Sequence, residues 1–282
     1  MQTKTGRINS GKFNLRYAIE GDGQNAVVIG SSYYYPRIFS KRLRKHLRLV
    51  FVDHRIFAEP YDVTNRNEYT LDLILDDMEL TRKQLNLGKI IVIGHSGHAF
   101  MALEYAKKYP ENVSHVVMIG MAPDLSAASQ KAADRYWQEL VSTERKNKLD
   151  SNLHSLDKKL VGLPPDQQFI QQYVANGPRA WFDFNFDATA LWDDARMNMP
   201  MFGYVWGEIF RDIDITKELD KLDKPVFVGL GLYDFIVAPF YSWDRIRHHF
   251  KNLTMRIFEK SGHTPPYEEP EKFDAELLHW LK

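Results

Sequence analysis

Hydrophobic residues along the chain gather in two kinds of segment, short uninterrupted runs and longer stretches with a helical repeat. The runs are typical of buried strands and lie at residues 13–19, 26–30, 49–52, 89–93, 115–119, 225–230 and 253–258. Strands that are apolar throughout occur in parallel sheets with helices on both faces, because each face then needs a hydrophobic surface. We therefore expect an α/β fold with a mostly parallel sheet flanked by helices.

Helices are expected between these strands. The clearest spans residues 70–87, where one apolar stripe contains Leu71, Ile74, Leu75, Met78 and Leu85. Thr70 stands at its cap position, and Gly88 follows its last turn. Further helices are expected near 36–47, 99–105 and 239–250, and from Pro270 to the end of the chain.

The alternation of strand and helix stops over residues 124–222. The first half of this segment is polar and helical in character, whereas residues 181–210 contain nine aromatic residues and three methionines. We expect a core made of residues 1–123 and 223–282, with 124–222 inserted as a mainly helical cap. The aromatic cluster fits either the interior of that cap or the wall of an apolar pocket.

Composition excludes several classes of protein. The 282 residues carry 37 basic and 37 acidic side chains, so no net charge attracts nucleic acid or an anionic membrane. No apolar stretch is long enough to span a bilayer, and the first residues contain no hydrophobic signal segment. With no cysteine, disulfides and thiolate metal sites are excluded, and we expect a cytoplasmic protein.

Three reactive residue types each follow an apolar strand. Ser96 lies in residues 94–98, between the strand at 89–93 and a helix, where a tight turn can expose a hydroxyl group. Serine is a weak nucleophile that needs a base held by a third group. Asp234 and His263 follow the next two strand ends of the later part of the chain, each beside a glycine. This order predicts a Ser–His–Asp catalytic triad.

Each of these residues has a simpler reading. Asp234 could cap the helix expected at 239–250, and His263 could be a solvated surface histidine. His95 and His98 flank Ser96 and invite a metal site, but no carboxylate cluster accompanies them. We therefore expect neither a metal nor a cofactor, and it is the joint pattern that favours the triad.

Over nearly its whole length the sequence resembles the α/β-hydrolase fold family, and within it the proline iminopeptidase branch and its capped esterase relatives. Residues 53–55 are similar to the Asp-Gln-Arg-Gly segment of that branch, and 94–97 to its nucleophile elbow. Residues 231–234 resemble its acid loop, 261–263 its histidine loop, and 267–273 the entry to its last helix. The resemblance implies that Ser96 is the nucleophile, that His263 acts as base and then acid, and that Asp234 orients the histidine.

The chain also departs from that branch. His98 replaces the second glycine of the elbow, and Gly97 replaces the tryptophan that usually follows the serine. The usual glycine-rich oxyanion loop reads Gly-Ser-Ser-Tyr-Tyr at residues 30–34. We expect the oxyanion hole to pair the backbone N–H groups of Gly97 and Ser32, with Ser31 as the alternative.

These patterns predict a serine hydrolase that cleaves an ester or amide bond of a small molecule or short peptide. An aminopeptidase needs an acidic group for the substrate's ammonium, for which Glu208 and the pair at 193–194 are candidates, whereas an esterase needs only apolar walls. The candidate pocket residues are Tyr33, His95, Trp181, Trp206 and Glu208. A scaffold of this fold that binds a small apolar ligand without turnover is the alternative from another class.

Overall fold

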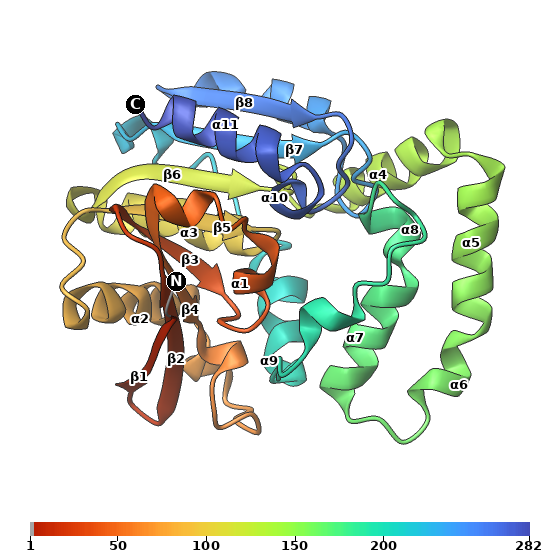
Figure 1. The fold of residues 1–282 in the computed structure, drawn as a ribbon, viewed down its shortest axis with the longest axis horizontal. Coiled ribbons are helices and arrows are strands. Elements are labelled where there is room, and N and C mark those ends of the chain that lie inside the picture. Colours follow the sequence, from red (N-terminus) through yellow and green to blue (C-terminus); the bar gives the residue numbers. More distant parts are fainter. Residues whose placement is uncertain (1–2) are drawn as a thin grey trace.

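The computed structural model describes residues 3–282 and contains one eight-stranded sheet with the order β1-β2-β4-β3-β5-β6-β7-β8 (Figure 1). Strands β1 (Lys4–Ser10) and β2 (Phe13–Glu20) form an antiparallel hairpin at one edge, and β2 is also antiparallel to β4 (Leu47–Asp53). Every other pairing is parallel. The expected mostly parallel α/β sheet is therefore confirmed.

The strands expected from the sequence are present within a few residues of their expected ends. After β2 and β4 these are β3 (Gln24–Gly30), β5 (Ile90–His95), β6 (Val113–Ile119), β7 (Val226–Gly231) and β8 (Leu253–Phe258). Strand β1 was not expected, because Ile8 is its only buried residue and the strand has no apolar run. An edge strand that exposes most of its side chains leaves little hydrophobic signal.

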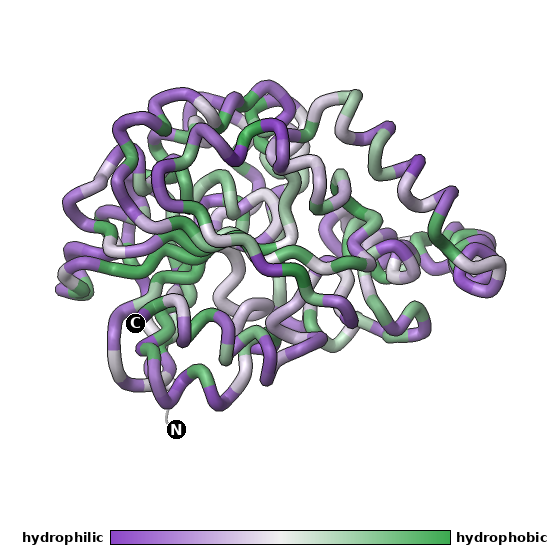
Figure 2. The backbone as a smooth tube through the Cα atoms, turned by 90° about the horizontal axis from the view of Figure 1, so that it is seen from above, coloured by the Kyte–Doolittle hydropathy of each residue, from purple (hydrophilic) through white to green (hydrophobic). Residues whose placement is uncertain are grey.

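The strands bury alternate side chains on the two faces of the sheet. Val27 and Ile29 of β3 belong to one hydrophobic cluster, whereas Ala26 and Val28 belong to the other. Helices α2 (Leu71–Gln84) and α3 (His98–Lys108) cover the first face, and α1 (Tyr35–Ile38) and α11 (Pro270–Trp280) cover the second. The hydrophobic segments gather in the central strands, and polar segments follow the outside of the molecule (Figure 2). This layering explains why the strands read as continuous apolar runs.

The chain between β6 and β7 is mainly helical and leaves the sheet. Helices α5 (Thr143–His154), α6 (Leu156–Leu160) and α7 (Pro165–Ala175) stand to one side of the strands, and α9 (Met199–Tyr204) lies nearer to them (Figure 1). The remaining elements of this segment are α4 (Ala127–Leu140), α8 (Gly177–Ala180), a 3-10 turn η5 (Thr189–Trp192), a π-helical turn η6 (Val205–Ile209) and a 3-10 turn η7 (Leu219–Lys221).

The helix expected at 36–47 is wrong. The structure has the short α1, a break at 39–42, and a 3-10 turn η1 (Leu43–Lys45). The buried Arg44 side chain explains the break, because its guanidinium donates to the carbonyls of Pro36, Phe39 and Ser40 at 2.5–2.7 Å and pairs with Glu20. These bonds satisfy carbonyls that a longer helix would use internally.

The helix expected at 239–250 is also wrong, since this stretch forms two 3-10 turns, η8 (Phe240–Arg245) and η9 (Arg247–His249). Trp243 is fully buried there, and its indole N–H donates to the Met121 carbonyl at 2.9 Å. This hydrogen bond and the burial of the indole hold the segment against the core as 3-10 turns, which are wound more tightly than an α-helix. No helix within residues 3–282 is long and apolar enough to cross a membrane.

Replacing Arg44 with alanine should lower the free energy of unfolding by roughly 3–5 kcal/mol, because it leaves Glu20 unpaired and three carbonyls without their donor. Urea denaturation measures the change. Lys41→Ala is the matched control, since Lys41 is exposed in the same loop, and it should change stability by no more than about 0.5 kcal/mol. Equal effects of the two variants would contradict this reading of the loop.

Candidate active site

Ser96 occupies a sharp turn between β5 and α3. Its φ is +57°, in the left-handed region that a non-glycine residue rarely adopts. The backbone N–H of Ser96 donates to the Ile119 carbonyl of β6 at 2.8 Å. A Cβ atom on Gly94 would lie 2.0 Å from the His98 carbonyl oxygen, so this turn requires glycine at 94. The strand-to-helix turn predicted around Ser96 is thus present, with the serine at its apex.

His263 and Asp234 form a buried pair at the ends of β8 and β7. His263 Nδ1 lies 2.8 Å from Asp234 Oδ2, and each residue is no more than 5% exposed. A carboxylate only accepts hydrogen bonds, so Nδ1 carries the proton and Nε2 is left as the basic nitrogen. Asp234 Oδ1 accepts from the Ile236 N–H at 3.0 Å, which fixes the carboxylate within its own loop. Asp234 caps no helix, and His263 is not a surface residue.

Two adjacent glutamates hold the loop that carries His263. Glu268 accepts from the backbone N–H groups of Gly262 and Thr264 at 3.0 and 3.1 Å, on either side of the histidine. It also accepts from Phe182 N–H at 2.7 Å. Glu269 accepts from Lys260 N–H at 2.8 Å. Burial raises the pKa of Glu268 to about 7, although those backbone hydrogen bonds lower it.

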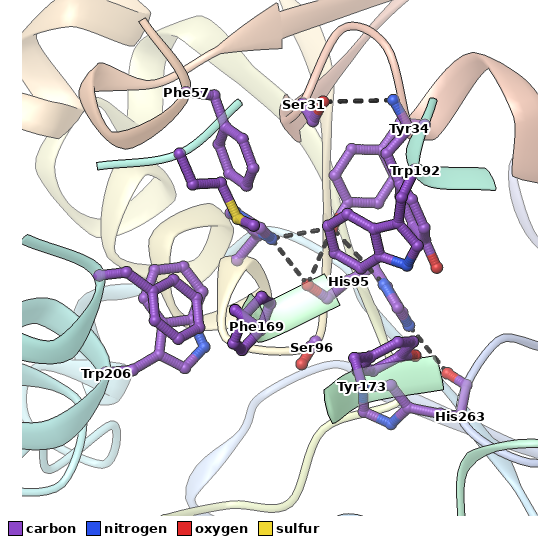
Figure 3. A pocket seen from close by; sticks show the side chains of 14 residues that line it. Ser31, Tyr34, Phe57, His95, Ser96, Phe169, Tyr173, Trp192, Trp206 and His263 are labelled. Carbon is purple, nitrogen blue, oxygen red and sulfur yellow. Dashed lines mark hydrogen bonds between the residues drawn. The ribbon is translucent and has the colours of Figure 1, made fainter. Parts of the chain in front are cut away.

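Ser96 and His263 line the same pocket, with a cavity volume of about 80 Å³ (Figure 3). In Figure 3, Trp206 and His263 lie on opposite sides of Ser96, with Phe169, Tyr173 and Trp192 around them. The other lining residues are Ser31, Tyr34, Tyr35, Phe57, His95, His98, Met197 and Phe202. None of the fourteen lining residues is acidic. The pocket is therefore mainly aromatic and contains histidine as its only titratable group besides tyrosine.

Three further histidines form a buried network beside Ser96. His95 Nε2 lies 2.8 Å from the His263 carbonyl and must donate, because a carbonyl has no proton. His54 Nδ1 accepts from the Ile56 N–H at 3.4 Å, so His54 Nε2 carries the proton and donates to His98 Nε2 at 2.9 Å. The proton of His98 is then on Nδ1, which lies 2.8 Å from the Tyr35 hydroxyl oxygen and 3.1 Å from the His95 carbonyl. Burial lowers the pKa of all three rings, that of His98 to about 4. The network is therefore neutral near pH 7, and His95 supports the backbone of His263.

Only two of the five expected pocket residues line the pocket, His95 and Trp206. Tyr33 lies outside it, beneath the Arg16 guanidinium at 4.1 Å. Trp181 is buried in the hydrophobic cluster on the α11 face of the sheet. Glu208 forms an exposed ion pair with Arg66 at 2.9 Å. These three expectations are wrong, because a position in the sequence does not show which way a side chain faces in the folded protein.

The pair of acidic residues at 193–194 also lies away from the pocket. Arg37 binds both of them, donating to the Asp193 carbonyl at 2.6 Å and pairing with Asp194 at 3.4 Å. Neither residue lines the pocket. The acidic group that an aminopeptidase would need is therefore supplied by neither expected candidate.

The expected oxyanion donor Ser32 is already engaged. Its backbone N–H donates to Asp53 Oδ1 at 2.5 Å, and its carbonyl accepts from Arg16 at 2.9 Å. Ser32 does not line the pocket, whereas Ser31 does. The expected pairing of Ser32 with Gly97 is therefore wrong in its first member. Ser31, the alternative, has the better position.

Phe169 and Tyr173 reach the pocket from α7 and were not expected from the sequence. They lie in a polar helix of the inserted segment, four residues apart and thus on one face. That spacing was the available signal. Tyr34 and Phe57 were also missed, since each stands in a loop whose course the hydrophobic pattern does not define.

With this geometry in view, comparison with known proteins gives a consistent result. The sequence model of the alpha/beta hydrolase fold matches residues 28–270. The chain belongs to the alpha/beta hydrolase fold family. It is 39% identical to the AB hydrolase superfamily protein YclE of Bacillus subtilis over 278 residues, covering 99% of each chain.

More distant relatives also have the alpha/beta hydrolase fold or belong to its family. A proline iminopeptidase of Saccharolobus solfataricus is 24% identical over 91% of this chain and 84% of its own. The structure of an alpha/beta fold family hydrolase from Bacillus anthracis str. Sterne superimposes with a TM-score of 0.69, covering 97% of each chain at 19% identity. The expected resemblance to this family and to its proline iminopeptidase branch is confirmed. Membership indicates hydrolase activity.

Asp53 should make stability depend on pH. Burial raises the pKa of Asp53 to about 7, while hydrogen bonds from Ser32 and the charge of Arg16 lower it. Because this value exceeds the ordinary 3.8, the unfolded chain ionises first and the free energy of unfolding falls as pH rises toward 7. Asp53→Asn should remove a slope of up to about 1.4 kcal/mol per pH unit.

Urea denaturation of both proteins at pH 5 and pH 8 measures this difference. From pH 5 to pH 8, the free energy of unfolding of the variant should rise relative to that of the wild type by more than about 1 kcal/mol. Glu268 is intact in both proteins, so its own titration cancels in the comparison. Parallel stability curves would contradict the raised pKa of Asp53.

Proposed function

We propose that this protein is a serine hydrolase in which Ser96, His263 and Asp234 form the catalytic triad. The observation that carries the proposal is the convergence of the left-handed Ser96 and the Asp234-bound His263 on one buried pocket. Left-handed backbone at a serine persists only where the surrounding fold enforces it, and such strain concentrates at functional sites. Membership of a hydrolase family supports the same assignment.

In this mechanism His263 Nε2 takes the hydroxyl proton of Ser96 as Oγ attacks the substrate carbonyl. Asp234 holds Nδ1–H and stabilises the imidazolium that forms. The proton then passes to the leaving alcohol, and the C–O bond of the ester breaks to give an acyl-serine. Water, deprotonated by His263, attacks the acyl carbon, and the proton returns to Ser96 Oγ as the acid is released.

The backbone N–H groups of Gly97 and Ser31 are the proposed donors to the oxyanion. Gly97 opens α3 directly after the nucleophile, where backbone N–H groups point away from the helix. Ser31 lines the pocket after β3. Two such donors matter, since losing one costs on the order of 100- to 1,000-fold in rate.

The substrate is proposed to be a neutral ester with an apolar acyl group. An α-ammonium group would have to leave water for a pocket that has aromatic walls and no acidic lining residue, and an unpaired buried charge is costly. The proline iminopeptidases among the relatives make the peptidase the competing candidate. Capped esterase activity fits the observed lining better.

A fluorophosphonate probe should label the wild type and neither Ser96→Ala nor His263→Ala. Asp234→Asn should lower the labelling rate by about 10,000-fold, since an amide at this place favours the wrong tautomer of the histidine. In-gel fluorescence with folded protein, checked by circular dichroism, measures this. If Ser96→Ala were labelled as strongly as the wild type, the assignment of Ser96 as the nucleophile would be wrong.

Short p-nitrophenyl esters should be hydrolysed at least about 100-fold faster, in kcat/KM, than a proline arylamide, since burying an unpaired ammonium costs several kcal/mol. Glu208→Gln should leave both rates unchanged, because Glu208 pairs with Arg66 outside the pocket. Proline arylamide turnover that exceeds ester turnover would favour the peptidase.

A further inference from the structure

The indole of Trp206 lies directly against Gly97, the residue that follows Ser96. A Cβ atom on Gly97 would lie 2.5 Å from Trp206 Nε1 and 2.6 Å from Cε2. The φ and ψ of Gly97 are −54° and −26°, ordinary helical values that any residue adopts. The backbone at position 97 would accept any residue. Glycine is required there because the indole of Trp206 occupies the space that a side chain would need.

Several rings hold the indole in this place. It stacks on Phe202 with ring centroids 4.5 Å apart and an interplanar angle of 17°. Phe210, which is buried, and His98 each form a T-shaped pair with it, with ring centroids 5.0 and 5.2 Å away. Such aromatic pairs contribute beyond the area that they bury. The position of the indole is thus defined by both the inserted segment and the elbow helix α3.

Trp206 stands on the π-helical turn η6, a rare winding that is frequent at functional sites. Gly203 and Gly207 flank it, and a Cβ atom added to either would meet nothing within 4 Å. The side chain is partly buried and lines the cavity beside Ser96.

We propose that Trp206 closes the acyl end of the pocket and restricts the substrate to esters of short acyl groups, about acetyl to butanoyl. This inference rests on the proposed serine hydrolase function. The cavity of about 80 Å³ is small beside the roughly 300–1,000 Å³ of drug-sized ligand sites. A cavity of this size favours short acyl chains while the indole is in place.

The first test compares kcat/KM for p-nitrophenyl acetate and p-nitrophenyl octanoate. Trp206→Ala should raise the octanoate-to-acetate ratio by about 10-fold or more, because methylene groups bound in a hydrophobic pocket each contribute strongly to discrimination. Trp280→Ala is the matched control, since Trp280 is a partly buried tryptophan of α11 that packs on Phe227, away from the pocket. It should leave the ratio unchanged.

A second test uses the contact itself. Gly97→Ala should lower kcat/KM for the acetate ester, because the new methyl group collides with the indole beside the nucleophile. Adding Trp206→Ala should restore a large part of that loss, although alanine at 206 is itself a truncation. This rescue distinguishes the contact from a general loss of folding, which a second truncation would not repair.

The outcomes separate the two proposals. Wild type that hydrolyses no ester and takes no fluorophosphonate label would overturn the serine hydrolase function and this inference with it. Ester turnover with equal octanoate-to-acetate ratios in the wild type and Trp206→Ala would overturn the role of Trp206 alone. Failure of Trp206→Ala to rescue Gly97→Ala would also overturn it.

Discussion

The turn at Ser96 is the constraint on which the site depends. Strand β5 ends and α3 begins within three residues, so the chain reverses where a serine must adopt a left-handed φ of +57°. Such a conformation costs on the order of 1–3 kcal/mol. It persists because β5 is paired on both sides, with β3 and β6, and because α3 is buried at residues 99–103, 105 and 106. The buried centre of the sheet thus enforces the strained turn.

Parallel strands bring the remaining groups to the same place. The carboxyl ends of β5, β7 and β8 lie at one edge of the sheet, so the loops that carry Ser96, Asp234 and His263 converge although 167 residues separate the first from the last. The ring of His95 then joins two of these loops, since it donates to the His263 carbonyl at 2.8 Å. The residue directly before Ser96 therefore also supports the backbone of His263.

Much of this arrangement could be predicted from the sequence, because buried strands and the loops after them have strong local signals. The seven strands from β2 to β8 follow from their apolar runs, and Ser96, Asp234 and His263 stand in the loops after three of them. The helix expected at 36–47 did not form because the Arg44 guanidinium, which pairs with Glu20 of β2, binds the carbonyls of residues 36, 39 and 40.

The pocket was the least predictable part. Trp181 and Trp206 belong to the same aromatic cluster in the sequence, yet one is core on the α11 face and the other lines the site. Likewise, nothing in residues 30–34 shows that Ser32 N–H is bound by Asp53 from the neighbouring strand β4. Pocket walls and oxyanion donors depend on how segments distant in sequence pack, and a single sequence does not record this.

The chain that leaves the sheet after β6 returns to support the loop that carries His263. Ala180 accepts from His263 N–H at 2.6 Å, and Phe182 donates to Glu268, which in turn holds the two residues beside the histidine. Hydrogen bonds thus join the inserted segment to the histidine loop. Displacing the segment would break bonds on which the orientation of His263 depends, so the position of the segment and the orientation of this imidazole are thermodynamically coupled.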